Sequence, residues 1–127
     1  MRTQYHFRPG VERLDAWDVA RLIELSRDLP VVEVPVDSLG EIDSNYWFGD
    51  GFGEPTVRRV VEHFRLVRDV DPAFPVILGA YGRVMDGMHR IARALLAGDR
   101  TIRAVRFAVD PAADYRNCLP DELPYRA

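Results

Sequence analysis

Apolar residues recur at helical spacing in the first part of the chain. In residues 14–29, the positions that share one face are Val19, Leu22, Ile23, Ser26 and Leu29. Asp15 stands before them as a capping residue, and Pro30 ends the pattern. The pattern therefore predicts a helix over residues 14–29, preceded by a loose arm over residues 1–13.

A second helical pattern starts at Pro55 and Thr56 and runs to Asp71-Pro72. The positions with the spacing of a buried stripe are Val57, Val60, Val61, Phe64 and Val67. The positions expected to face water are Arg58, Arg59, Glu62 and Arg65. This segment gives the clearest helix prediction in the chain.

Extended segments fall between and after these helices. VVEVPV over residues 31–36 predicts a short strand, and Pro35 places it at a sheet edge or at its own end. FPVILGAYGRVMDG predicts a hairpin around Tyr81-Gly82. A helix from Met88 to Ala97 follows, capped by Gly98 in a left-handed conformation, and residues 101–109 then alternate as another strand.

Together these elements predict an α+β fold, a small mixed β-sheet with flanking helices. The length of 127 residues suits one domain. It comprises the arm 1–13, a core at about 14–109 and a proline-containing tail 110–127 that packs as an extended segment or frays. Residues 38–55 form a long irregular connection rich in glycine and aromatic residues, and such connections are often functional.

Composition narrows the class of protein. Apolar residues make up 47% and charged residues 29%, as in ordinary globular proteins. The net charge of −3 argues against sequence-specific DNA binding, because DNA-binding domains are usually basic. Cys118 is the only cysteine, so no internal disulfide or cysteine-based zinc site forms. No apolar run suits a membrane span or a secretory signal, which predicts a cytoplasmic location.

The stretch Asp86-Gly87-Met88-His89-Arg90 is the strongest candidate for chemistry. A strand that turns directly into a helix leaves the first helical N–H groups without internal partners, and these groups attract anions. Gly87 allows close approach to the backbone, Arg90 is a two-pronged phosphate donor, and His89 donates or transfers a proton. Asp86 would hold a sugar hydroxyl, orient His89 or position a metal. The alternative is structural: a turn-and-cap pair with a surface ion pair.

This stretch, followed by IARALLAG and a strand, resembles the ParB/sulfiredoxin superfamily. The corresponding motif reads G-G-C-H-R in sulfiredoxins, D-G-x-H-R in free serine kinases of the same fold, and G-x-R-R in ParB N-terminal domains. VEVPVDSL and FPVIL-x(5)-VMDG match the upstream strand and hairpin in order. The resemblance covers about residues 31–108, with its specific part at 86–98, and implies a stand-alone ParB-like domain.

The resemblance implies nucleotide phosphates at Gly87, Met88, His89 and Arg90. Met88 occupies the position of the reactive cysteine of sulfiredoxins, which excludes that activity because methionine forms no sulfur–phosphoryl intermediate. The second nucleotide and metal box of ParB, E-N-x-Q-R, has no counterpart in VDPAADYRNCLPDELP, and no helix-turn-helix follows.

Other candidate residues lie in the irregular connection. Tyr46 and Trp47, with Phe48, would stack on a nucleobase or close one side of the core. Glu41 and Asp43 are candidate acid–base groups or metal ligands, with solvated loop acids as the alternative. His63 is expected to make a partly buried hydrogen bond.

These observations predict binding of a nucleoside triphosphate, ATP or CTP, with Mg²⁺ bridging its phosphates and no intrinsic metal site. If the protein is an enzyme, it is an NTPase or phosphotransferase with Asp86 and His89 as catalytic residues. The alternative is a non-enzymatic interaction or regulatory module that binds a protein partner or forms a homodimer. A ParB-like nuclease is a third reading, with no carboxylate–histidine cluster for two metals to support it.

Overall fold

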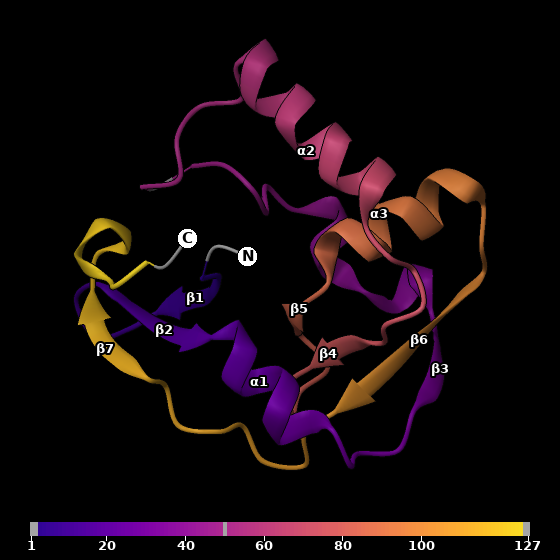
Figure 1. The fold of residues 1–127 in the computed structure, drawn as a ribbon, viewed down its shortest axis with the longest axis horizontal. Helices are drawn as coiled ribbons and strands as arrows, with labels where there is room; N and C mark the ends of the chain where they lie inside the picture. Colours follow the sequence, from indigo (N-terminus) through magenta and orange to yellow (C-terminus); the bar gives the residue numbers. More distant parts are fainter. Residues whose placement is uncertain (1–2, 50, 126–127) are drawn as a thin grey trace.

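The computed structural model describes residues 3–49 and 51–125, and its strands form two sheets (Figure 1). The three-stranded antiparallel sheet has the order β1-β2-β7, with strands Tyr5–Pro9, Leu14–Asp18 and Tyr115–Cys118. The four-stranded sheet has the order β3-β6-β4-β5, with strands Val32–Pro35, Thr101–Arg106, Val76–Leu78 and Val84–Asp86. In the second sheet β4 and β6 are parallel and the other pairs antiparallel. The sheet is therefore mixed, which confirms the α+β class.

Within the described residues, three α-helices connect the strands: α1 (Val19–Ser26), α2 (Val57–Asp69) and α3 (Met88–Ala97). The same part of the chain has 3₁₀ turns at Val36–Ser38, Gly40–Asp43 and Pro120–Glu122. The structure confirms the β4–β5 hairpin, the bounds of α3 and the left-handed Gly98 after it. It also confirms that β3, which contains Pro35, is an edge strand.

The predicted helix over residues 14–29 is wrong in its first part. Leu14–Asp18 is a strand because its backbone pairs with β1 on one side and with β7 on the other. The helix starts at Val19, and its cap is Asp18, whose side chain accepts a hydrogen bond from Ala20 N at 2.9 Å. Ile23, expected on the buried face, is 52% exposed.

The predicted loose arm is also wrong, whereas for the tail the structure confirms the first of the two alternatives, an extended segment that packs on the domain. Residues 5–9 form the edge strand β1, and residues 115–118 form β7 on the opposite side of β2. The Tyr5 hydroxyl donates to the Pro124 carbonyl, and its ring meets that of Tyr115 edge-on. The two ends of the chain therefore build a sheet together, which a reading of local patterns does not reveal.

Both faces of the four-stranded sheet are covered. On one face, α3 and the 38–48 connection pack on a cluster that includes Val76, Leu78 and Val84. On the other, α1 and β2 pack on a cluster that includes Ile77, Met85 and Val105. Adjacent residues of one strand point to opposite faces, so VIL in β4 contributes to both clusters.

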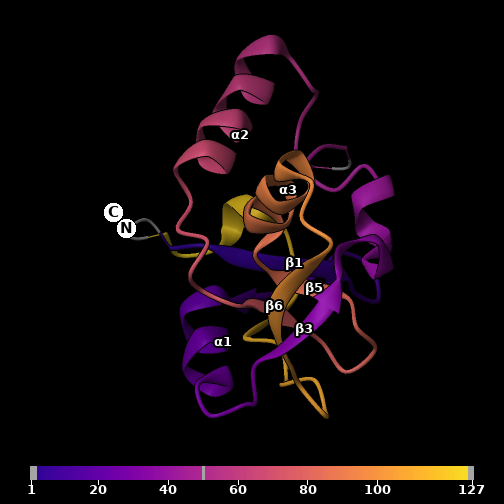
Figure 2. The same ribbon diagram turned by 90° about the vertical axis from the view of Figure 1, so that its right-hand side faces the viewer.

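Helix α2 lies on the outer side of α3, away from both sheets (Figure 2). Its predicted buried stripe is therefore wrong in part. Val67 is buried and Val60 half-buried, but Val57 and Phe64 are 83% and 64% exposed and Val61 is exposed as well. The spacing predicts the helix correctly, but one neighbouring helix covers only part of its apolar face. Among the described residues, no helix has the length and apolar character to cross a bilayer.

Candidate functional site

The turn from β5 into α3 depends on a glycine. Gly87 has φ 109° and ψ 21°, a left-handed conformation that side chains with a Cβ rarely adopt. A Cβ there would also lie 2.9 Å from Arg90 Nη2 and 3.2 Å from Val76 Cγ2. The first intrahelical hydrogen bond runs from Ile91 N to the Gly87 carbonyl, at 3.0 Å. The amides of residues 88–90 precede that bond, so they are the unpaired donors of the helix start.

Arg90 and Asp86 form an ion pair across this turn. Arg90 Nη2 donates to Asp86 Oδ2 at 2.8 Å, and the two side chains are only 13% and 18% exposed. The guanidinium lies against Gly87, and its Nε is buried with no hydrogen-bond partner in the described part of the chain. Arg90 is not among the residues that line the adjacent cleft. In this structure it neutralises Asp86 and supports the turn.

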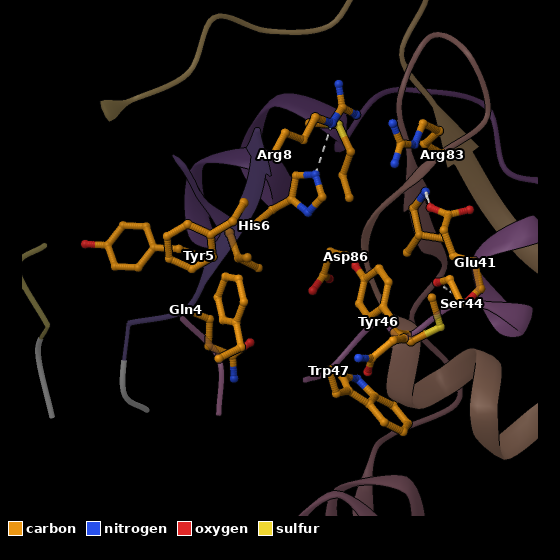
Figure 3. Close-up of a pocket in the computed structure, with 18 of the residues that line it drawn as sticks. Gln4, Tyr5, His6, Arg8, Glu41, Ser44, Tyr46, Trp47, Arg83 and Asp86 are labelled. Carbon is orange, nitrogen blue, oxygen red and sulfur yellow. Dashed lines mark hydrogen bonds between the residues drawn. The ribbon is translucent and has the colours of Figure 1, made fainter. Parts of the chain in front are cut away.

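A cleft of about 800 Å³ opens beside the turn (Figure 3). It lies between the edge strand β1 and the edge strand β5, and it is lined by residues 4–9, 44–49 and 83–89, with Leu14, Val19, Glu41 and Phe52. The rings of Phe7 and Phe52 meet with a centroid distance of 5.3 Å, so the 44–53 connection reaches across to β1. This volume is within the usual range for small-ligand sites.

The start of α3 forms one wall of this cleft. Gly87, Met88 and His89 line it, together with Asp86 at the end of β5. Figure 3 shows Asp86 and Tyr46 on one side of the cleft and His6 on the other, with Arg8 and Arg83 together at one end. Of the predicted site residues, the structure thus gathers Glu41, Tyr46, Trp47, Asp86, Gly87, Met88 and His89 around one space. It does not bring the exposed Asp43 to that space.

Trp47 stacks on two histidines. Its ring lies 4.4 Å from that of His63, at 16°, and 5.0 Å from that of His89, at 11°. Phe48 meets His63 edge-on at 5.3 Å. Trp47 belongs to the packing around α3 and also lines the cleft, so the two predicted roles of this aromatic segment, core packing and contact with a ligand, are compatible.

His89 is hydrogen-bonded to His63 of α2, with 2.9 Å between His63 Nδ1 and His89 Nε2. This confirms the prediction of a partly buried hydrogen bond for His63. Burial, together with the neighbouring His63 and the charge of Arg90, lowers the pKa of His89 to about 4. Burial also lowers the pKa of His63, against the opposing charge of Glu62. Both rings are therefore neutral at neutral pH.

Tyr46 and Glu41 complete this wall. Burial and the carboxylates of Glu41 and Asp86 together raise the pKa of Tyr46 to about 12, against the opposing charges of Arg8 and Arg83, so its hydroxyl keeps its proton. Glu41 Oε2 accepts a hydrogen bond from Val84 N at 2.6 Å. This bond ties the irregular connection over residues 38–55 to β5. Glu41 thus has a positioning contact in addition to its place in the cleft.

The opposite wall comes from β1, which sequence reasoning treated as a loose arm. Arg8 Nε donates to His6 Nε2 at 3.2 Å, and Arg8 Nη1 pairs with Asp110 at 2.7 Å. Burial and the charges of Arg8 and Arg83 together lower the pKa of His6 to about 4, against the opposing charge of Asp110. The signal in the sequence was the run YHFRPG before a second extended run, LDAWD, which together suit a hairpin.

The described residues contain no cluster of three or more histidine, cysteine or acidic side chains placed to hold a metal ion. Asp86 and Glu41 are the carboxylates that line the cleft, and each already accepts a hydrogen bond from the protein. Mg²⁺ often binds proteins mainly through substrate phosphates and water. Such binding requires no cluster of protein ligands.

No protein-family model, curated protein or solved structure matches this chain.

Proposed function

We propose that the protein binds a nucleoside triphosphate in this cleft, with the phosphates at the first turn of α3. The supporting observation is that Gly87, Met88 and His89 line a cleft of about 800 Å³ at a helix start. Unpaired N–H groups and the positive end of the helix dipole favour an anion at that point. Gly87 presents only backbone atoms to the cleft, while Arg90 and Val76 fill the side on which a Cβ would lie.

The ion pair between Asp86 and Arg90 makes an anion acceptable there. An unpaired carboxylate at the end of β5 would repel a phosphate bound one residue further on. Arg90 offsets that charge at 2.8 Å in a largely buried setting. Arg90 thus supports phosphate binding through Asp86 and Gly87, while the backbone of residues 87–89 makes the contact.

The remainder of the cleft suits a nucleoside. Trp47 has one face on the two imidazoles, and a base would stack on its other face beside Tyr46. Arg83, exposed at the hairpin turn, adds a positive charge at the end of the cleft. Mg²⁺ would bind through the triphosphate and neutralise part of its charge.

The proposal includes membership of the ParB/sulfiredoxin-like superfamily. The order β4, β5, α3 and β6 agrees with that resemblance, since a hairpin leads into a helix and then into a strand parallel to the first. The additional sheet β1-β2-β7 supplies the second wall of the cleft.

Isothermal titration with the Mg²⁺ complexes of ATP, CTP and GTP tests this proposal. We expect at least one to bind, and we expect Arg83→Ala to weaken binding several-fold. Arg58→Ala removes an exposed arginine of α2 outside the cleft and serves as the matched control. The absence of heat with all three at millimolar concentration, or equal losses in both variants, would contradict it.

A second candidate is a nucleotide-binding module without turnover. It is favoured by the contacts of the two predicted catalytic groups, because Asp86 is paired with Arg90 and His89 with His63. A phosphate-release assay separates the two candidates. An NTPase or phosphotransferase would release or transfer phosphate and lose this activity in Asp86→Asn. A binding module would show only a nucleotide-dependent rise in Tm.

A further inference from the structure

The two histidines that join α2 to α3 are arranged as a linear hydrogen-bonded pair. Their nitrogens are 2.9 Å apart, their ring centroids 5.2 Å apart and their planes 18° apart. Two imidazole rings that lie nearly in one plane have a centroid separation of 5.2 Å when their hydrogen-bonded nitrogens both lie on the line between the two centroids. The nitrogens do not converge on a third point, so this geometry suits a shared proton and not a metal ion.

The number of protons on such a pair is restricted. In the neutral state, one ring must donate through its N–H and the other must accept through its lone pair. One added proton on an outer nitrogen, His63 Nε2 or His89 Nδ1, leaves an imidazolium N–H that still donates to the neutral ring, and this bond is stronger. A second added proton leaves two donors facing each other and breaks the contact. The pair can therefore store one proton without losing its hydrogen bond.

The groups around the pair hold it neutral in the free protein. Arg90 on α3 opposes protonation of His89, and burial opposes it at both rings. Glu62 on α2 favours protonation of His63. The 44–49 segment contributes Trp47 and Phe48, which carry no charge, although the face of Trp47 attracts a cation. A negative charge near His89 would shift this balance toward the protonated state.

That charge would come from the ligand, because His89 lines the cleft at the second residue of α3. We propose that the His63–His89 pair takes up one proton from solvent when an anion occupies the first turn of α3, so that ligand binding is coupled to protonation. One N–H bond forms on an outer ring nitrogen as one O–H bond of a hydronium ion in the solvent breaks, and no other bond is made or broken. The inference depends on the proposed function and assigns a role to His63, which does not line the cleft itself.

Titration with MgATP at pH 8 and pH 5.5 tests the coupling in the wild type and in His63→Phe. Phenylalanine keeps a ring against Trp47 but cannot share or store the proton. At each pH, ATP is protonated to the same extent in the titration of the wild type and in that of the variant. Its protonation therefore cancels when the two proteins are compared. We expect the wild-type Kd to fall on acidification by about tenfold more than that of His63→Phe, since one linked proton changes affinity by up to tenfold per pH unit.

A second measurement keeps the test independent of that variant. The binding enthalpy of the wild type, measured at pH 6.5 in buffers of different ionisation enthalpy, should show net proton uptake, and His63→Gln should reduce that uptake. Binding with equal pH dependence in wild type and variants would overturn this inference and leave the nucleotide site intact. Failure of MgATP, MgCTP and MgGTP to bind at either pH would overturn both.

Discussion

Helices α2 and α3 lie side by side, yet they are held in the fold in different ways. Met88, Ile91 and Ala94 of α3 are buried against the four-stranded sheet, and Ile91 is 0% exposed. Helix α2 packs on α3 and buries Val67, and its His63 ring lies 4.4 Å from that of Trp47. Its polar contacts with the α3 side include the His63–His89 hydrogen bond and the Arg93 side chain, which donates to the Arg68 and Val70 carbonyls at the C-terminal end of α2.

This difference shows that apolar spacing determines where a helix forms, but not how much of its apolar face is covered. Both helices have a clear apolar face, but α3 meets a sheet and α2 meets one helix. A strip of α2 that includes Val57 and Phe64 therefore stays exposed. The core fixes the end of the cleft that α3 forms, whereas α2 is held by a few polar contacts, the buried Val67 and the stacking of His63 on Trp47.

The largest expected effect is at the centre of α3. Ile91→Ala should lower the free energy of unfolding by about 2–5 kcal/mol, because it removes a fully buried side chain and leaves a cavity. Chemical denaturation measures this loss. A loss below about 1 kcal/mol would mean that α3 is less firmly packed than the structure shows.

The next effect concerns the two glycines that flank α3. Gly87→Ala should cost about 1–3 kcal/mol, because alanine is strained at φ 109° and its Cβ meets Arg90 and Val76. Gly98→Ala is the matched control. It has φ 76° but no atom within 4 Å of the added Cβ, so it should cost less. Equal losses would show that the close contacts at Gly87 contribute nothing.

Acidification should loosen α2 before α3. The fold lowers the pKa of His89 from 6.5 to about 4 and also lowers that of His63. Between pH 6.5 and pH 4 the unfolded chain binds more protons than the folded chain. The stability that the neutral histidine pair contributes is therefore complete above pH 6.5 and is lost as the pH falls toward 4. Hydrogen exchange at pH 7 and pH 4.5, corrected for intrinsic rates, should show protection lost in α2 while residues 91–97 keep theirs. Uniform loss along both helices would contradict the comparison.

The smallest effect is expected on the exposed face of α2. Phe64→Ala should change stability by no more than about 0.5 kcal/mol, since the ring is 64% exposed. Thermal denaturation checks this directly. A loss comparable to that of Ile91→Ala would show that Phe64 is buried in solution.

The parts of the fold that sequence predicted correctly are those set by local rules. The β4–β5 hairpin and α3 were predicted because turn residues, spacing and two glycines lie within about 25 residues. The strand Leu14–Asp18 was read as helix because its pattern continues into α1. Its extended form depends on β1 and on β7, about 100 residues away. Long-range pairing of this kind overrides local preference.

The same limit applies to the site. The motif at residues 86–90 was found from sequence alone, as was the hydrogen-bonding role of His63. Its partner, 26 residues away in the chain, was not found, because only the packing of α2 on α3 brings His63 to His89. His6 and Arg8 were missed together with β1. The local sequence therefore predicts the wall of the cleft that the start of α3 forms, but it does not predict the opposite wall, which β1 forms.

The most direct test of the proposed nucleotide site is an amide chemical-shift titration of ¹⁵N-labelled protein with MgATP and MgCTP. The proposal predicts that the largest shifts fall on Gly87, Met88 and His89, with smaller ones at Tyr46, Trp47 and Arg83. Shifts that leave residues 87–89 unchanged, or that gather on the outer face of α2, would contradict the proposal that α3 begins at a phosphate site.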